Sequence, residues 1–251
     1  MTQNALPFVF DRNLVRRHIA RAQPHFANTS ALFDDTAAQI MERLGEIMHP
    51  FFNALDLSPF PFLARCREND VVVLTPEPRP DEEALDFAPQ SFDLIVSNLG
   101  LHWVNDLPGV LARCRDILKP EGLFLASLIG GRSLCELREC LAEAEIAVMG
   151  KASPRFSPMI DLRTAGGLMH RANFHLPVAD IETVTLLYED MFALMRDLRG
   201  MGQTNAHKDR LRRPTRRSVF FKAAELYRKR FCNADGLIPA TFEMIYLHGR
   251  R

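Results

Sequence analysis

The amino-acid sequence predicts an α/β fold in which helices cover a mainly parallel sheet. Strand-like and helix-like segments alternate through the middle of the chain, the loops between them are short, and two further strand-like segments appear in the last third. Alternation with short loops is typical of parallel sheets with right-handed crossovers. The two late strands predict an antiparallel hairpin at the edge of the sheet.

The first fifty residues are predicted to be helical. Residues 10–26 place four arginines on nearly one side of a helix, which favours a solvated face or, alternatively, a phosphate-facing patch. Apolar residues at the helical period predict a second helix over about 29–48. We therefore expect an N-terminal helical segment over 1–50 and an α/β domain over 51–251, with a helical insertion at about 190–235.

Short apolar or β-branched segments predict the strands. Two of them, 92–97 and 123–129, are apolar enough to be buried on both faces, as strands of parallel sheets are. The segment 181–188 alternates apolar and polar residues, as a half-exposed strand does. The predicted strands are 51–57, 71–74, 92–97, 123–129, 181–188 and 240–247.

Helix signals separate these strands. Asp106 caps a helix that runs to about Leu118, and 119–122 ends it. Ser133 and Glu136 have the spacing of a capping box, which predicts the start of the next helix. Two later helices are predicted over 191–200 and 215–231.

The composition narrows the class of protein. Among 251 residues, 31 Lys and Arg balance 31 Asp and Glu, which removes the simplest case for a nucleic-acid binder. No apolar run approaches the ~18–20 residues of a membrane span. Five cysteines occur without any C-x-x-C pair, which indicates buried thiols rather than a zinc or redox site. With no signal peptide at the start, we expect a reducing, cytoplasmic location.

Polar residues follow the predicted strands at their carboxyl ends, where open α/β sheets bind ligands. The segments 81–87, 91–97, 101–107 and 117–122 together resemble, in order and spacing, class I S-adenosylmethionine-dependent methyltransferases. The resemblance is strongest to the branch of the biotin-synthesis malonyl-carrier-protein methyltransferase and of a mitochondrial complex I assembly factor family linked to arginine hydroxylation. The assembly-factor branch is also matched by 10–12, 130–138, 153–158, 191–202 with Asn205, and 239–246.

The resemblance implies a Rossmann-like sheet and a site for S-adenosylmethionine or S-adenosylhomocysteine. Asp56 matches the acid before the cofactor loop, and Asp81 the acid that accepts a hydrogen bond from the adenine amino group. Glu82 would present its backbone N–H to the ring, and 98–102 would line the pocket beside the sulfonium. Carboxylates suit a cationic cofactor. The implied cofactor-binding residues are Asp56, Ser58, Asp81, Glu82, Asn98 and His102.

Two features depart from the family pattern. The family loop is glycine-rich because bare backbone approaches the cofactor, whereas 55–62 holds no glycine, so 58–61 is expected to crowd the site. Asp81 follows Asp56 by 25 residues, which one helix of ~11 residues, one strand of ~5 and their loops nearly fill. One helix–strand unit is therefore predicted to be missing, which leaves Glu77 as a displaced candidate for the ribose contact.

The sequence is compatible with three functions: a methyltransferase-like protein, an arginine hydroxylase or assembly factor, and a non-catalytic scaffold. Catalytic residues stay unassigned, because methyl transfer needs positioning more than acid–base groups, and no metal-ligand motif is found. His102 and Trp103 either wall a ligand site or pack together. The segment 208–217 holds six basic residues against one acid, so it is a solvated loop or docks an acidic carrier or respiratory-subunit protein. It has no interleaved aromatics, which argues against nucleic acid.

Overall fold

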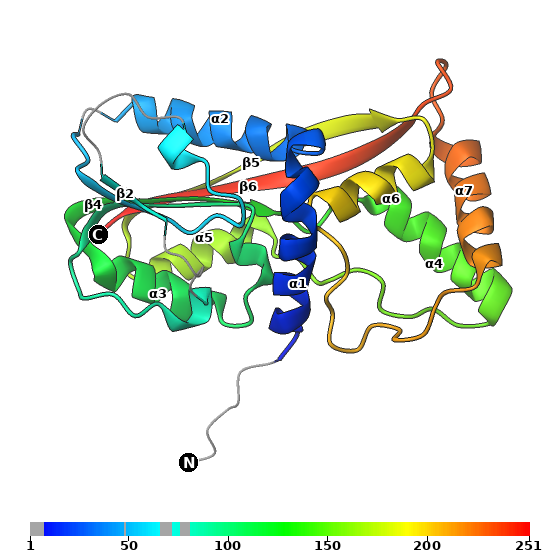
Figure 1. Ribbon diagram of the computed structural model, residues 1–251, viewed down its shortest axis with the longest axis horizontal. Helices are drawn as coiled ribbons and strands as arrows, with labels where there is room; N and C mark the ends of the chain where they lie inside the picture. Colours follow the sequence, from blue (N-terminus) through cyan, green and yellow to red (C-terminus); the bar gives the residue numbers. More distant parts are fainter. Residues whose placement is uncertain (1–7, 48, 66–71, 76–80) are drawn as a thin grey trace, which may run out of the picture.

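A computed structural model describes residues 8–47, 49–65, 72–75 and 81–251 (Figure 1). These residues form a six-stranded sheet in the order β2-β1-β3-β4-β6-β5. The first four strands in this order are parallel, whereas β6 runs antiparallel to both β4 and β5. The predicted α/β fold with an antiparallel C-terminal hairpin is thus confirmed. The strands are β1 (Asn53–Asp56), β2 (Val72–Leu74), β3 (Phe92–Asn98), β4 (Leu118–Ile129), β5 (His175–Tyr188) and β6 (Ile238–Arg250).

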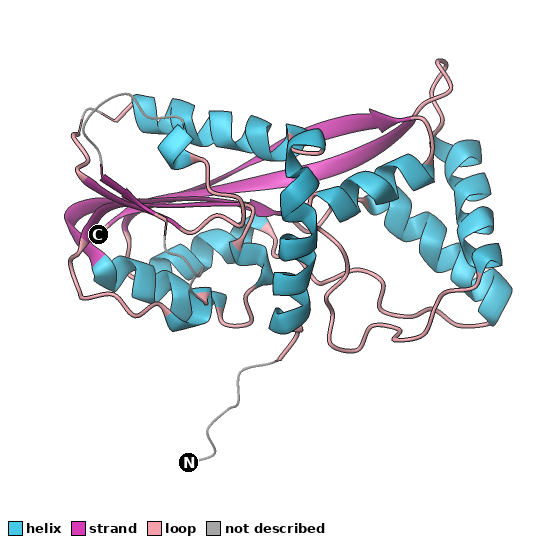
Figure 2. Ribbon diagram, in the orientation of Figure 1, coloured by secondary structure: helices cyan, strands magenta, loops and turns pink. Residues whose placement is uncertain are grey.

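Helices cover both faces of this sheet (Figure 2). Several begin with an aspartate whose carboxylate accepts a backbone N–H of the first turn, as Asp106 does from Gly109 and Asp190 from Ala193. In the part of the chain described, no helix is long and apolar enough to cross a membrane. The helices are α1 (Arg12–Ala22), α2 (Ala31–Gly45), α3 (Leu107–Ile117), α4 (Cys135–Met149), α5 (Leu162–Arg171), α6 (Met191–Gly200) and α7 (Arg217–Phe231). Short 3-10 turns are η1 (Gln23–Asn28), η2 (Leu63–Arg65), η3 (Glu82–Ala84) and η4 (Leu101–Trp103).

The core lies in two layers, one on each face of the sheet. Successive strand residues point to opposite faces, so Leu94 and Val96 of β3 pack with α2, whereas Ile95 packs with α3 and α5. Figure 1 shows α2 on one side of the sheet and α3 and α5 on the other. The helices α4, α6 and α7 lie beside the part of the β5–β6 hairpin that projects from the rest of the sheet, and α1 lies between the two groups. This position brings α1 to the carboxyl ends of the parallel strands.

Helix α5 was not predicted from the sequence. Its interior contains Gly166 and Gly167, which are poor helix formers and hide the helical pattern. The helix is instead set by the Asp161 cap and by burial of Ala165 and Met169 against the sheet.

The capping box predicted at Ser133 and Glu136 was wrong. The residue before α4 is Leu134, in the left-handed conformation with φ of 56°, and it makes no side-chain cap. The Ser133 hydroxyl instead accepts the Glu243 N–H at 2.9 Å, and the Glu136 carboxylate accepts the Thr241 hydroxyl of the same strand. The two polar side chains therefore anchor α4 to β6 rather than to its own first turn.

The shortened stretch between Asp56 and Asp81 gives the sheet a small outer edge. Its described residues contain only η2 and the three-residue strand β2, which pairs with β1. This agrees with the predicted loss of one helix–strand unit. Glu77, considered for a ribose contact, and Cys66 lie outside the described residues.

Candidate functional site

The loop after β1 folds around the carboxylate of Asp56. This side chain is only 3% exposed, and it accepts the backbone N–H groups of Ser58, Phe62 and Leu63 at 2.9, 2.9 and 3.0 Å. A buried carboxylate that accepts several backbone N–H groups fixes the path of a loop. Asp56 thus organises a loop that has no glycine.

Phe60 does not crowd the site, contrary to the expectation from the sequence. Its ring turns into the core, where it stacks on Phe26 with a centroid distance of 3.7 Å and meets the edge of Phe33 at 5.3 Å. Pro59 and Pro61 remain on the site side of the loop. The Phe60 side chain lies away from the site because Phe26 of η1 and Phe33 of α2 form an aromatic pocket for it.

A cavity of about 410 Å³ lies beside this loop, at the carboxyl ends of β1 and β3. Its volume falls in the range of small-molecule sites. We call it the first cavity. Asp56, Ser58 and Glu82 line its sheet side together with Gly100, and α1 closes the opposite side through Arg12 and other residues. Three of the six residues predicted to bind a cofactor are therefore brought together.

Asp81 lies beside this cavity rather than in its wall. Its carboxylate accepts the Glu83 N–H that starts η3 and pairs with Arg12 at 3.1 Å and with Arg16. Burial raises the pKa of Asp81, but the Glu83 N–H and the Arg12 guanidinium outweigh it, so the pKa lies below its usual value. Arg12 also pairs with Glu82. These ion pairs hold α1 against the sheet.

Asn98 makes only internal contacts, although the resemblance placed it in the pocket. Its side-chain oxygen accepts the hydroxyls of Thr36 at 2.7 Å and Ser127 at 2.6 Å, and its NH₂ group donates to the Phe33 carbonyl at 2.8 Å. Its backbone N–H donates to the Ser58 hydroxyl at 2.8 Å. Asn98 therefore ties α2 to β3 and β4 and supports the loop from behind.

His102 and Trp103 share one partner, Gln203, which sequence reasoning missed. The Gln203 side-chain oxygen accepts the Trp103 indole N–H at 2.9 Å and lies 3.0 Å from His102 Nε2. Since an oxygen can only accept, His102 Nε2 carries the proton and Nδ1 is a bare acceptor. Burial lowers the pKa of His102 to about 4, so the ring is neutral. Nδ1 is buried without a hydrogen-bond partner in the described protein.

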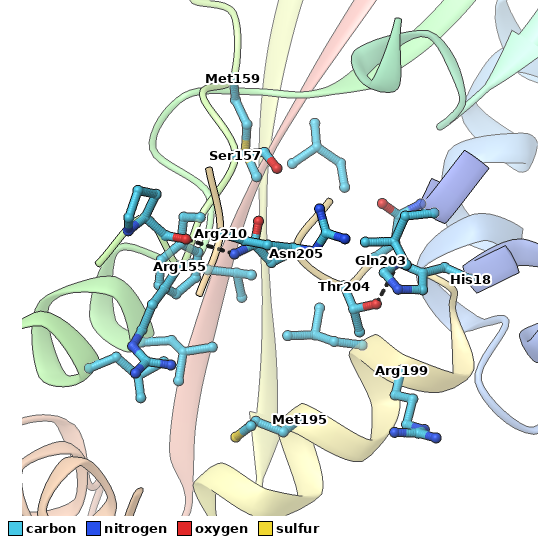
Figure 3. Close-up of a pocket in the computed structure, with 18 of the residues that line it drawn as sticks. His18, Arg155, Ser157, Met159, Met195, Arg199, Gln203, Thr204, Asn205 and Arg210 are labelled. Atoms are coloured by element: carbon cyan, nitrogen blue, oxygen red, sulfur yellow. Dashed lines mark hydrogen bonds between the residues drawn. The ribbon is translucent and has the colours of Figure 1, made fainter. Parts of the chain in front are cut away.

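Trp103 also lines a second cavity, of about 610 Å³, which Figure 3 shows. Its labelled residues come from α1, α6 and the loops before α5 and after α6. In it, His18 Nδ1 lies 2.8 Å from the Thr204 hydroxyl. Burial, followed by the charge of Arg21, lowers the pKa of His18 to about 4. Apolar side chains of α4, including Leu137 and Leu141, form the opposite wall.

Sequence reasoning could not have selected the polar residues of the second cavity. Gln203 and Thr204 follow a predicted helix without a recognisable motif, and His18 lies on the helix interpreted as a basic surface. Their position after the helix 191–200, close to Asn205 of the matched segments, was the available signal. Only the fold brings α1 against the loop after α6.

Neither metal nor thiol chemistry is visible in the parts of the chain that the structure describes. No three His, Cys, Asp or Glu side chains converge there as metal ligands do. Cys114 and Cys140 are buried, and burial raises their pKa values to about 12 and about 11. Cys135, expected to be buried, is exposed.

A mainly parallel sheet with a ligand-sized cavity at the carboxyl ends of its strands is the arrangement of a Rossmann-type fold, and the match of a methyltransferase domain model makes the chain methyltransferase-like. The methyltransferase domain model matches residues 51–126. A protein of Bacillus halodurans, provisionally described as a methyltransferase, has the same fold, with a TM-score of 0.56 and 14% identity over 85% of this chain and 97% of that one.

Sequence comparison then identifies the family. The human mitochondrial arginine-hydroxylase NDUFAF5 is 36% identical over 265 residues, which cover 96% of this chain and 76% of the human protein. The malonyl-[acyl-carrier protein] O-methyltransferase of Xylella fastidiosa is 41% identical over 66% of this chain and 54% of that protein. The chain belongs to the family of the arginine-hydroxylase NDUFAF5.

The matches also correct one expectation. The NDUFAF5 relatives are mitochondrial proteins, so the expected cytoplasmic location was wrong. Cysteine usage and the first residues of the chain do not distinguish one reducing compartment from another. The match spans 37% of the length of the Dictyostelium discoideum relative and 52% of the zebrafish relative.

Proposed function

We propose that the chain binds S-adenosylmethionine in the first cavity and modifies a substrate held in the second. The observation that carries this proposal is the place of Trp103, which lines both cavities. A group-transfer enzyme must hold two molecules in contact, and two ligand-sized cavities that meet at one residue provide for this. Helix α1 also contributes to both walls.

The first cavity offers a cofactor two carboxylates and apolar surface, with Arg12 and Arg16 in the same wall. Asp56 and Glu82 contribute carboxylates, which favour a nearby sulfonium or ammonium group. Pro59 and Pro61 provide apolar surface of the kind that a flat adenine packs against. S-adenosylmethionine, when bound, supplies an activated methyl group. The chain's own residues would bind and orient it, and α1 would exclude water from that side.

Arginine hydroxylation is the second candidate, and a specific observation favours it. The identity with the human arginine-hydroxylase extends over almost the whole chain, whereas the match to the malonyl-[acyl-carrier protein] O-methyltransferase covers two thirds of it. A non-catalytic scaffold is the third candidate. Its support is that the carboxylates of the first cavity already have protein partners.

Calorimetry with S-adenosylhomocysteine and with S-adenosylmethionine tests the cofactor site. We expect saturable heat, weakened in a Glu82→Gln variant. Absence of heat at millimolar ligand would favour the scaffold. Mass spectrometry of a candidate protein substrate then separates the two enzymes, because methylation adds a CH₂ unit and hydroxylation adds an oxygen atom.

The basic segment 208–217 is proposed to dock an acidic carrier or respiratory-subunit protein. Arg212, Arg213, Arg216 and Arg217 are exposed. Arg210 instead turns inward and pairs with Asp11 at 3.1 Å. The proposal rests on the exposed charges, which would attract an acidic surface at low salt.

A further inference from the structure

The second cavity differs from an ordinary apolar pocket in its charges. Four arginines line it, and no aspartate or glutamate does so among the described residues. They come from α1, the loop before α5, α6 and the loop after α6: Arg21, Arg155, Arg199 and Arg210.

Two of these arginines are neutralised from behind the wall. Arg155 makes a two-pronged contact with Glu145, at 2.7 Å and 2.9 Å, and Glu145 is itself buried. Arg210 pairs with Asp11. The two-pronged contact holds the Arg155 guanidinium rigidly, and a single contact joins Arg210 to Asp11. Because Glu145 and Asp11 already balance these two charges, they give no reason to expect an anionic ligand.

The other two arginines have no such partner. Neither Arg21 nor Arg199 forms an ion pair with an acidic side chain of the described residues, and both are exposed. Burial lowers the pKa of Arg21, and the charge of Arg199 lowers it further. Two cations that repel one another at the rim of a cavity favour an anion there.

A second observation points to a ligand at this site. Ser157 lines the cavity and is only 5% exposed, and its buried hydroxyl has no hydrogen-bond partner in the described protein (Figure 3). Buried hydroxyls are nearly always satisfied, so an orphaned one in a cavity wall marks a place for a polar ligand atom. Thr204 and Asn205, by contrast, already bond to His18 and to the Pro154 carbonyl.

The rest of the wall is apolar. Leu137 and Leu141 of α4, Met195 of α6 and Phe220 of α7 face the same space. A ligand that fills it must therefore bury an apolar chain, and apolar burial supplies most of the affinity in such sites.

We infer that the second cavity binds an anionic amphiphile, with a carboxylate or phosphate head at the Arg21–Arg199 rim and an apolar chain along α4. As the identity of the substrate this inference rests on the proposed function. As a binding site it can be tested without the cofactor. A positively charged ligand, such as a free arginine side chain, meets at the same rim two cations that have no acidic partner among the described residues.

The single tryptophan provides the readout, because Trp103 lines this cavity. We would titrate the full chain with decanoate and with decyl phosphate, following Trp103 fluorescence and calorimetric heat. Decanol, decyltrimethylammonium and inorganic phosphate are the comparison ligands. We expect each anionic amphiphile to bind at least tenfold more tightly than the other three. The tighter of the two anions identifies the head group as carboxylate or phosphate.

Variants at Arg21 and Arg199 separate the contribution of the ligand's charged head group from that of its apolar chain. Replacing both rim residues, Arg21→Glu with Arg199→Glu, should weaken the anions at least tenfold and leave decanol unchanged. Arg196→Glu is the matched control, since Arg196 is exposed on the same helix but does not line the cavity. Ser157→Ala should weaken the anions about threefold.

The outcomes are distinct. Equal binding of decyltrimethylammonium, no binding of either anion, or anion affinity unchanged in the rim variant each overturns the inference. S-adenosylhomocysteine is titrated in the same variants, and we expect the rim changes to leave its affinity intact. Anion binding without any heat from S-adenosylhomocysteine would overturn the proposed cofactor function and keep the amphiphile site.

Discussion

The two cavities share Trp103 and helix α1, but they differ in whether the charged side chains in their walls have partners within the protein. In the first, the carboxylates of Asp56 and Glu82 are engaged by loop N–H groups and by Arg12. In the second, the charges of Arg21 and Arg199 have no acidic partner among the described residues. The first cavity therefore uses both carboxylates to hold the protein together, whereas the second leaves two of its four arginines without an acidic partner among the described residues. Removing the Asp56 carboxylate from the first cavity should therefore lower stability, whereas replacing Arg21 and Arg199 in the second should change ligand binding alone.

The largest expected effect is at Asp56. Asp56→Ala removes the acceptor of three buried N–H groups in the loop, each bond to a charged group contributing roughly 1.5–3 kcal/mol, not additively. We expect a loss of about 3–5 kcal/mol in the free energy of unfolding and a collapsed first cavity. Urea denaturation followed by Trp103 fluorescence measures it.

Asp35→Ala is the control for this change, because Asp35 is exposed on α2 and its loss should alter stability by less than about 0.5 kcal/mol. If Asp56→Ala were as stable as this control, the loop would not depend on its carboxylate. The charged groups of the first cavity would then not stabilise the protein, and the contrast between the two cavities would be wrong.

The next effect concerns pH and the two neutral histidines, His18 and His102. Both have pKa values of about 4 in the folded protein, while the unfolded chain binds these protons near pH 6.5. Protonation therefore favours the unfolded chain, and stability falls as the pH drops from about 6.5 to about 4. Each histidine contributes at most about 1.4 kcal/mol per pH unit in this window.

Replacing His102 alone shows how much of this pH dependence of stability it contributes. His102→Phe should lessen the fall in stability between pH 7 and pH 5, and His175→Gln, at an exposed histidine, should leave it unchanged. The free energy of unfolding in urea at several pH values is the measurement. A parallel fall in all three proteins would mean that other groups carry the dependence.

Much of this arrangement could be read from the sequence, and what could not has physical reasons. The order of strands and helices follows largely from local patterns, and α6 lies where a helix was predicted, at about 191–200. Asp56, Ser58 and Glu82 converge because strand ends meet at one edge of a parallel sheet. Asn98 sits at the same edge yet points into the core, because Thr36 and Ser127 from two other elements surround it. Such long-range contacts leave no local pattern.

The third prediction compares neighbouring acids of the first cavity. Glu82 lines it and Asp81 does not, so Glu82→Gln should weaken S-adenosylhomocysteine about tenfold, while Asp81→Asn should weaken it threefold or less. The family pattern alone predicts the reverse order, since it assigns the adenine contact to Asp81. Calorimetry on both variants decides between them. Circular dichroism confirms that each variant is folded, since both acids pair with Arg12.

The smallest effect on the protein itself is expected in the exposed basic segment. Arg212→Glu combined with Arg213→Glu should change stability by less than about 0.5 kcal/mol, because both side chains are exposed. Binding of an acidic carrier protein at low salt should nevertheless weaken several-fold, and added salt should remove the difference as it screens the charges. Arg228→Glu with Lys229→Glu, on the exposed face of α7, is the charge-matched control. If the two double variants lost equal affinity for the carrier protein, net charge alone would attract the partner. The segment 208–217 would then not be a docking surface.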